Sequence, residues 1–299
     1  MPDLVPFQKC IARPAEDGKS FPLSRHLYNV KLFMEKNIKS EPILGKLLGL
    51  AGLCHDVAKS HAYWQEYIKK KRQKGPNHAP EGAYLFSYLG YKLLKKEGKW
   101  EQYKIYWLWL TRDLADHHGT LKNIGQNYWI GSGQWQFMDL QGINDFVFSL
   151  YPGLGDIDIS AESLEEWTDD VYDVFEAAEE SIDLGYKSVE ISELMRELQK
   201  WRDITTILIA GDRFDVRSVE PSRFDRDAHH ENIRALERFC LGKQDQELSR
   251  VREESRRKIL GQLAEKPLEL VYTLEMPTGY GKTITALNMA SWLGLSQGY

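Results

Sequence analysis

Residues 52–60, GLCHDVAKS, place His55 next to Asp56, with Lys59 three positions further on. The apolar run before them has helical spacing and predicts one helix over residues 43–59. Neighbouring residues of a helix point about 100° apart, so the two side chains would lean toward one point without sharing a face. An adjacent pair of metal ions there would suit an imidazole and a bridging carboxylate. A hydrogen-bonded core histidine is the alternative for an isolated His-Asp doublet.

The composition limits the classes of protein to consider. The chain has 299 residues, 42% of them hydrophobic and 28% charged, which is typical of a globular protein with a large core. A net charge of -5 means that nucleic-acid binding would depend on a local patch, and the strong basic run is KKKRQK at residues 69–74. We expect a cytoplasmic protein with no membrane partner, because neither a signal peptide nor an apolar run of spanning length is visible.

Cysteine usage bears on the kind of metal site. Cys10, Cys54 and Cys240 are odd in number, far apart and in no CxxC spacing. The sequence therefore predicts neither a disulfide framework nor a thiolate zinc site. Any metal would be held by histidine and carboxylate side chains.

Helical periodicity runs through most of the chain and predicts an all-α domain over residues 1–240. Ser24 is the expected N-cap of the first helix, and Ser163 with Glu166 has the spacing of a capping box. Residues 120–158 break the pattern with Gly, Asn and Gln among aromatics, which predicts a surface insertion or lid. The expected helices cover residues 23–38, 43–59, 81–96, 101–119, 163–182 and 188–218.

The character of the sequence changes near residue 242. Residues 241–265 predict a charged linker or helix, and residues 266–299 predict a strand, a glycine loop and a helix, as at the start of a RecA-like domain. The loop PTGYGKT at 277–283 resembles the Walker A loop of superfamily 2 helicases, although Met276 stands where the strict pattern has Gly. We expect Lys282 to reach the terminal phosphates of ATP and Thr283 to take magnesium. The expected ATP-binding residues are Thr278, Gly279, Gly281, Lys282 and Thr283.

No carboxylate motif of the Walker B type follows this loop. The expectation is therefore a helicase fragment, with ATP and magnesium used only by the full-length protein.

Further histidines accompany the doublet. His26 lies in the first predicted helix, His78 opens HAPEGA, and His117 with His118 ends the aromatic helix. Asp212 follows the apolar run TTILIAG, where a buried carboxylate is costly unless it is paired or metal-bound, and Asp215 is the competing candidate. Singly, each has a structural alternative, such as a helix-capping role for the His pair. His61, His229 and His230 are expected at the surface.

In this order, ahead of a helicase loop, the motifs resemble the HD-superfamily nuclease domain of the CRISPR-associated nuclease-helicase of type I systems. The resemblance covers residues 20–220 and the loop, and it depends on the combination of HDVAK, HAPEGA, HHG and AGDRFD. Gly211 between Ala210 and Asp212 departs from the usual Ala-Asp pair, and residues 120–158 have no counterpart.

The resemblance implies a metal-dependent nuclease that cleaves single-stranded DNA in CRISPR interference, with a Cascade-type crRNA surveillance complex as partner. It implies two divalent metal ions in an all-nitrogen and oxygen environment, which suits Mn, Fe, Co, Ni or Mg. His55, Asp56 and Lys59 are the expected catalytic residues. One ion would be held by His26, His55, Asp56 and Asp212, and the second by Asp56, His78, His117 and His118.

Alternative functions remain open from the sequence. An HD phosphohydrolase acting on a nucleotide or cyclic nucleotide would use the same ligands but would not account for the helicase loop. A non-catalytic adaptor could use the histidines to bind metal for stability. A stand-alone P-loop ATPase is disfavoured because the sequence lacks the carboxylate motif.

Overall fold

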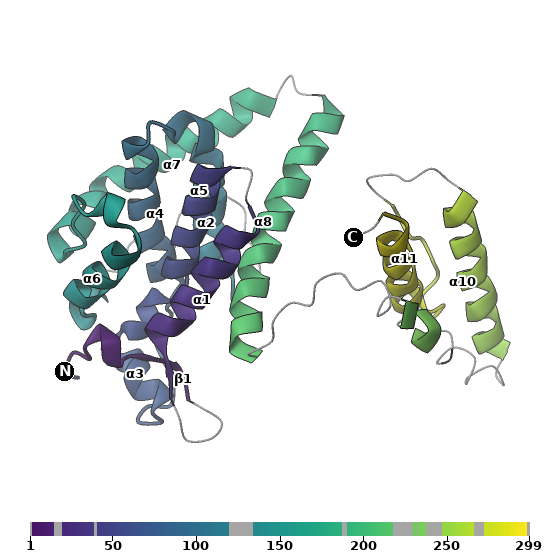
Figure 1. Cartoon of the computed structure of the whole chain (residues 1–299), viewed down its shortest axis with the longest axis horizontal. Helices are drawn as coiled ribbons and strands as arrows, with labels where there is room; N and C mark the ends of the chain where they lie inside the picture. Colours follow the sequence, from purple (N-terminus) through teal and green to yellow (C-terminus); the bar gives the residue numbers. More distant parts are fainter. Residues whose placement is uncertain are drawn as a thin grey trace. The chain divides into compact units, whose positions relative to one another are not determined.

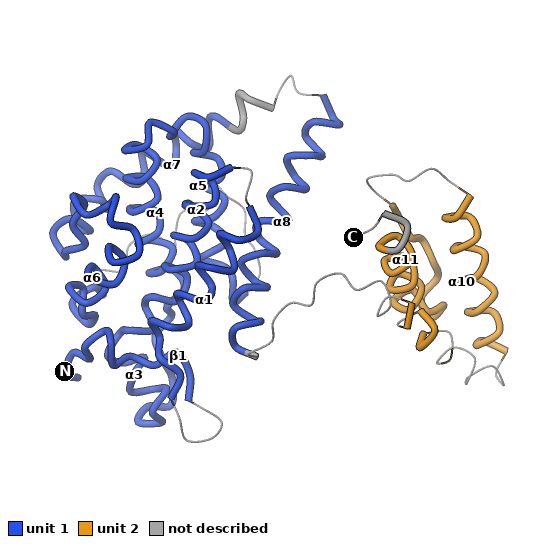
Figure 2. The backbone as a smooth tube through the Cα atoms, viewed as in Figure 1, with its two compact units in different colours: residues 1–220 blue, residues 221–299 orange. Residues whose placement is uncertain are grey.

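The computed structural model describes residues 2–14, 20–38, 41–119, 134–186, 190–217, 230–231, 233–236, 238, 247–265 and 272–297. These residues are mostly helical, as the sequence predicted (Figure 1). The chain divides into two compact units, residues 1–220 and 221–299 (Figure 2). The sequence had placed the end of the first domain at residue 240.

The elements of the first unit alternate long helices with short connecting turns, in which η denotes a 3-10 helix. They are η1 (Phe7–Lys9), β1 (Ile11–Arg13), β2 (Phe21–Pro22), α1 (Leu23–Lys36), α2 (Pro42–Cys54), η2 (Val57–Ser60), α3 (Ala62–Ile68), α4 (Ala79–Lys96), α5 (Trp100–Asp116), η3 (Gln134–Phe137), α6 (Leu140–Leu150), η4 (Pro152–Leu154), α7 (Ala161–Tyr186) and α8 (Ile191–Arg217). The two short strands pair antiparallel, Ile11 with Pro22 and Arg13 with Phe21.

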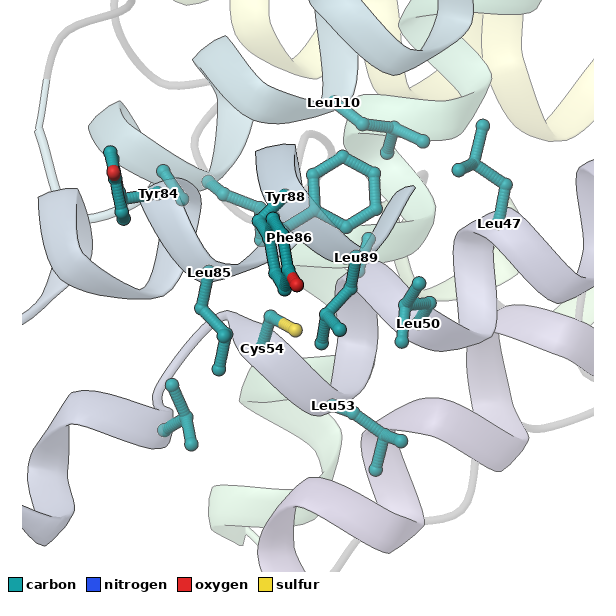
Figure 3. Packing of buried hydrophobic residues seen from close by; sticks show 14 of the residues in the cluster. Leu47, Leu50, Leu53, Cys54, Tyr84, Leu85, Phe86, Tyr88, Leu89 and Leu110 are labelled. Carbon is teal, nitrogen blue, oxygen red and sulfur yellow. The ribbon is translucent and has the colours of Figure 1, made fainter. Parts of the chain in front are cut away.

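Helix α2 forms the centre of the first unit. Apart from Lys46, every residue of α2 from Leu44 to Cys54 is buried, as expected for a helix that is apolar on all sides. It packs against α1, α4 and α5. Figure 3 shows Leu50 of α2 close to Leu89 of α4, and Cys54 of α2 close to Leu85 of α4.

Helix α1 packs on α2 through one apolar stripe. Leu23, Leu27, Val30 and Met34 are fully buried, which confirms the predicted face. The predicted cap is wrong, because Pro22 holds the N-cap position without a side-chain hydrogen bond and Ser24 lies inside the helix. Proline fits this position, because its backbone nitrogen has no hydrogen to leave unpaired.

Helices α5, α7 and α8 pack around this centre. Helix α7 buries a stripe at helical spacing that includes Leu164, Val171 and Phe175, while Asp173 on its other side is exposed, as its amphipathic sequence predicted. Ser160, not Ser163, caps α7: its Oγ accepts a hydrogen bond from the Ser163 N–H at 3.2 Å.

Residues 134–158 form part of the core, so the prediction of a surface insertion or lid is wrong for this part. Trp135, Met138, Ile143 and Val147 are all buried, and Asp139 caps α6 through the Gly142 N–H. Asp139 also accepts a hydrogen bond from the Phe7 N–H at 2.9 Å, which joins α6 to η1. Residues 120–133 lie outside the described part of the chain.

The second unit contains α10 (Glu247–Glu265) and α11 (Lys282–Gln297), which pack together. The helix expected in the charged segment is therefore present. Residues 272–277 carry no strand, and residues 266–271, where the predicted strand begins, lie outside the described residues. Across the described ranges, none of the helices has both the length and the apolar character needed to cross a membrane.

Candidate metal centre

The His55-Asp56 doublet lies at a break in the backbone, not inside a helix. Helix α2 ends at Cys54, His55 is its C-cap, and Asp56 leaves helical geometry with φ -120° and ψ 12° before η2 begins. The predicted continuous helix over 43–59 is wrong at this point. Because the backbone turns here, both side chains point into one buried space, and each is fully inaccessible.

Four side chains form the first group of potential ligands, His26, His55, Asp56 and Asp212. His26 Nε2 lies 3.2 Å from Asp56 Oδ2 and 3.5 Å from Asp212 Oδ1. His55 Nε2 lies 3.8 Å from the same Asp212 oxygen. Helices α1 and α8 pack side by side and supply His26 and Asp212, so residues far apart in the sequence meet at the doublet.

The second group contains Asp56, His78, His117 and His118. Asp56 Oδ1 lies 3.1 Å from His78 Nε2, 3.6 Å from His117 Nε2 and 3.5 Å from His118 Nε2. His78 is the N-cap of α4 and His117 is the C-cap of α5, so two helix ends meet here. The His118 side chain is 43% exposed, which makes this group the more accessible one.

Asp56 belongs to both groups, with Oδ2 near His26 and Oδ1 near His78. In each group the ligand atoms lie within 4.8 Å of one another. The two groups are the two ligand sets implied by the sequence resemblance, so the structure brings together all the expected metal-binding residues. Neither group contains cysteine, and Cys10 and Cys54 are buried free thiols.

Three of the histidines are oriented by a hydrogen bond on the nitrogen that faces away from the centre. His55 Nδ1 donates to the Gly52 carbonyl at 2.8 Å, and His117 Nδ1 donates to the Leu114 carbonyl at 2.6 Å. His26 Nδ1 donates to Asp215 Oδ2 at 2.6 Å. Because these nitrogens carry the proton, each Nε2 presents a lone pair to the centre, which is the tautomer a metal needs.

The centre contains buried lone pairs that lack a hydrogen-bond donor, an arrangement that suits a cation. His26 Nε2 and His55 Nε2 face each other at 3.2 Å, and both would be acceptors when the two rings are neutral with the proton on Nδ1. Asp56 Oδ1 and His117 Nε2 are buried and make no hydrogen bond with any residue the structure describes. Buried acceptors in this state are costly unless a proton or a cation lies between them. A divalent metal ion in each group would remove this cost.

The electrostatics agree with this interpretation. Burial alone would raise the pKa of Asp56, but His55, Lys59 and the neighbouring imidazoles hold it well below its usual range, so Asp56 is ionised. Burial lowers the pKa of His78 and of His117, which favours neutral imidazoles that can act as ligands. Burial would also lower the pKa of His55, but Asp56 and Asp212 raise it to about 9. A metal ion would therefore compete with a proton at His55.

Lys59 lies beside the doublet, as expected. Its Nζ forms an ion pair with Asp56 Oδ2, and its side chain is mostly buried. The Asp56 carboxylate thus contacts the Lys59 ammonium group on one side and imidazole rings on the others.

Sequence reasoning missed some of the residues that support the ligands. Asp215 was weighed as a ligand, but it binds the outer nitrogen of His26 and accepts a second hydrogen bond from Asn29 at 2.7 Å. Trp64 packs against His78 with ring centroids 4.4 Å apart and the two planes tilted. The spacing of Asp212 and Asp215 on one helix was a partial signal for Asp215, whereas no sequence pattern indicated Trp64 as a support.

The surface assignment of His61 is wrong. Its side chain is buried, and its Nδ1 caps α3 by accepting from the Tyr63 N–H at 3.1 Å. Rings of Tyr63 and Phe137 cover it. His230 is exposed, as predicted, and His229 lies outside the described residues.

Comparisons of the chain with models of protein families, with curated proteins and with solved structures found no match. The candidate function therefore rests on the geometry of the centre and on the sequence motifs.

A second candidate site lies in unit 2 at the glycine loop. Gly279 and Gly281 have φ values of 85° and 82°, which side-chain-bearing residues rarely adopt, and α11 begins at Lys282. The loop borders a cavity of about 520 Å³ that is also lined by Arg252, Glu253 and Arg256 of α10, with Glu253 and Arg256 joined in an ion pair. All the predicted ATP-binding residues line this cavity: Thr278, Gly279, Gly281, Lys282 and Thr283. A helix N-terminus with nearby cations suits a phosphate group.

Proposed function

We propose that unit 1 is a metal-dependent nuclease that cleaves single-stranded DNA. The observation that carries the proposal is the sharing of Asp56 between two ligand groups, one on each of its carboxylate oxygens. A carboxylate in this position suits two cations held close together. Two such ions, of Mn, Fe, Co, Ni or Mg, would activate a water as nucleophile and stabilise the leaving oxygen of a phosphodiester.

The protein side chains have separate tasks in this proposal. His26, His55 and Asp212 would hold one ion, while His78, His117 and His118 would hold the other. Asp56 would bridge the two, and its ion pair with Lys59 keeps it charged. Lys59 would also attract the phosphate group. Burial of the first group excludes water from most of its surface, which strengthens each of these interactions.

The proposal predicts that Asp56→Asn abolishes cleavage of single-stranded DNA in the presence of Mn²⁺. Asparagine keeps the size of the side chain but removes the charge that both ligand groups share, so we expect a loss of at least about 100-fold. A fluorescent gel assay of a labelled oligonucleotide measures it. Asp173→Asn, at an exposed position of α7, is the matched control and should cleave normally. Unchanged cleavage by Asp56→Asn would contradict the proposal.

A panel of substrates separates this proposal from the alternative of a nucleotide phosphohydrolase. The wild-type chain is given single-stranded DNA, nucleoside triphosphates and cyclic nucleotides with the same metal. Turnover of DNA with little turnover of the small molecules supports the nuclease. The reverse preference would support the phosphohydrolase, and stoichiometric metal without any turnover would support the non-catalytic adaptor.

For the full-length protein, we propose an ATP-dependent helicase activity that uses the loop at 277–283. The cavity beside Lys282, with Arg252 and Arg256, supports phosphate binding there. Participation in CRISPR interference, with a Cascade-type crRNA surveillance complex as partner, is part of the same proposal and rests on the resemblance of the motifs alone. Cytoplasmic localisation, which was expected from the sequence pattern, is part of the proposal as well.

A further inference from the structure

We propose that residues 69–74 and the aromatic side chains beside them form a binding surface for single-stranded DNA that leads to the second ligand group. We call residues 69–74, KKKRQK, the basic loop. This inference rests on the proposed function, because it names the path by which the substrate of that centre arrives.

The position of the basic loop is fixed by close packing. Gly75, which directly follows the loop, approaches Trp64 so closely that a Cβ on it would lie 2.6 Å from Trp64 Cε3. Trp64 in turn packs against His78, with ring centroids 4.4 Å apart. The loop therefore ends one side chain away from a ligand of the second group.

The second group is also the open side of the metal centre. His118 is 43% exposed, whereas His26, His55 and Asp56 are at most 2% exposed. Among the ligands of the two groups His118 is the most exposed, well above Asp212 at 15%, so we expect the strand to approach near His118. The basic loop borders this side through Trp64 and His78.

The charge of the basic loop is not neutralised by protein. All five cations in it are exposed, and none forms an ion pair with an acidic residue among those the structure describes. The protein as a whole carries a net charge of -5, so this positive surface is a local exception. Such a surface fits a polyanion, and it stands where a substrate of the centre would enter.

Aromatic side chains beside the loop favour a single strand over a duplex. Arg72 lies over the Tyr63 ring at 4.3 Å, and Tyr67 is 38% exposed next to Trp64. Unpaired bases stack on exposed aromatic rings, whereas the bases of a duplex already stack on each other. Cations next to a partly exposed tyrosine therefore offer contacts to both the backbone and the bases of a single strand.

The test compares two variants with the same loss of charge. Lys69, Lys70, Lys71 and Lys74 are changed together to glutamine, and the control changes Lys92, Lys95, Lys96 and Lys99 to glutamine. The control lysines are also exposed, but they lie at or just beyond the far end of α4, an 18-residue helix about 27 Å long that begins after His78. Binding of a labelled oligo-dT to the full chain is measured by fluorescence anisotropy in EDTA, where no strand is cut.

We expect the basic-loop variant to bind at least about tenfold more weakly than wild type at low salt. The slope of log K against log salt should fall by about 0.7 for each phosphate contact that is lost. The control variant should bind like wild type, and a duplex of the same length should bind more weakly than the single strand. Equal weakening in both variants, no weakening in the basic-loop variant, or an equal preference for the duplex would overturn the inference.

A cross-linking experiment tests the inference without depending on the folding of a multiple variant. A photo-reactive p-benzoylphenylalanine replaces Gln73 in one protein and the exposed Glu97 in another. We expect cross-links to oligo-dT from position 73 and not from position 97, and the opposite pattern would overturn the inference.

Failure of this inference and failure of the proposed function give different results. If wild type binds DNA through the basic loop but shows no Asp56-dependent cleavage in any divalent metal, the nuclease proposal is wrong and the inference of a DNA-binding surface is supported. If cleavage depends on Asp56 but the basic-loop variant has unchanged KM and affinity, the inference of a DNA-binding surface is wrong and the nuclease proposal is supported.

Discussion

Asp215 shows how a single residue outside the ligand groups can control one of them. It accepts a hydrogen bond from His26 Nδ1 and so keeps the lone pair of Nε2 directed at the centre. Asn29 donates to its other oxygen, and Arg13 donates to its backbone carbonyl at 2.9 Å. The carboxylate is thus fixed in place before any metal arrives.

We predict that Asp215→Ala weakens Mn²⁺ binding by about 10- to 100-fold, because His26 would lose its fixed tautomer and orientation. Isothermal titration calorimetry measures the affinity. Asp203→Ala, at an exposed position of the same helix, is the control and should bind as wild type does. Wild-type affinity in Asp215→Ala would show that the hydrogen bond does not matter for the site.

Asp113 makes stability depend on pH. Burial raises its pKa to about 7, although a hydrogen bond from Thr205 partly offsets this. The folded state therefore holds the proton more tightly than the unfolded state does. The resulting stabilisation is complete at low pH and is lost as pH rises through about 7.

We predict that Asp113→Asn removes this dependence. Between pH 4 and pH 8 the free energy of unfolding of wild type should fall by up to about 4 kcal/mol relative to that of the variant. Urea denaturation at a series of pH values measures the difference between the two proteins, so titration of the metal centre cancels. Parallel pH curves would contradict the assigned pKa.

Individual ligands could be predicted only through the resemblance of the motifs to a known family. His26, His78 and Asp212 were expected as ligands from motif order, and the structure brings them to Asp56. The burial of His61 could not be predicted, because it depends on Phe137, which lies far along the chain. Asp212 and Asp215 could not be separated by sequence, since only the direction of His26 decides which one faces the centre.

At the scale of elements, the contact between α4 and the end of α2 positions the doublet. Gly82 of α4 lies against this turn, where a Cβ would come within 2.4 Å of the Cys54 carbonyl oxygen and 2.6 Å of the His55 carbonyl oxygen. Both neighbours are backbone atoms, which move only if the helices separate. Gly82 of the HAPEGA motif thus allows α4 to pack closely against the backbone at the end of α2.

We predict that Gly82→Ala destabilises the protein by about 1 to 3 kcal/mol and also weakens metal binding, because it displaces His55. Thermal unfolding and calorimetry with Mn²⁺ measure the two effects. Gly153→Ala serves as control, since no atom lies within 4 Å of a Cβ there. A stable Gly82→Ala protein with normal metal affinity would mean that α4 can shift without cost.

The sequence predicted the long helices well, because an apolar stripe such as that of α1 or α7 is a repeated signal. Prediction from the sequence failed where a single local interaction decides where a helix begins or ends. The end of α2 at Cys54 has no glycine or proline to mark it, and the choice of Ser160 over Ser163 as a cap depends on how the chain enters α7. Residues 134–158 looked like a loop because the apolar face of α6 is short.

For the whole molecule, the division into two compact units predicts that the metal centre does not need unit 2. All the ligands come from residues 26–212, within unit 1. A chain of residues 1–220 should fold, bind two Mn²⁺ ions and unfold within about 2 °C of the unit 1 transition of the full chain. Circular dichroism and metal analysis test this, and aggregation or loss of metal in the short chain would contradict it.

The packing of α1 against α8 also affects how the protein is made. Asp215 binds His26 across 189 positions of sequence, and Asp212 approaches the same ring. During translation, His26 is therefore synthesised long before Asp212 and Asp215, the two carboxylates that lie beside it in the folded protein. Joining such distant partners is a slow event in folding, so a nascent chain would keep an open cleft until α8 docks. A cation would then bind to the first ligand group only at the last stage of maturation, after synthesis of unit 1 has finished.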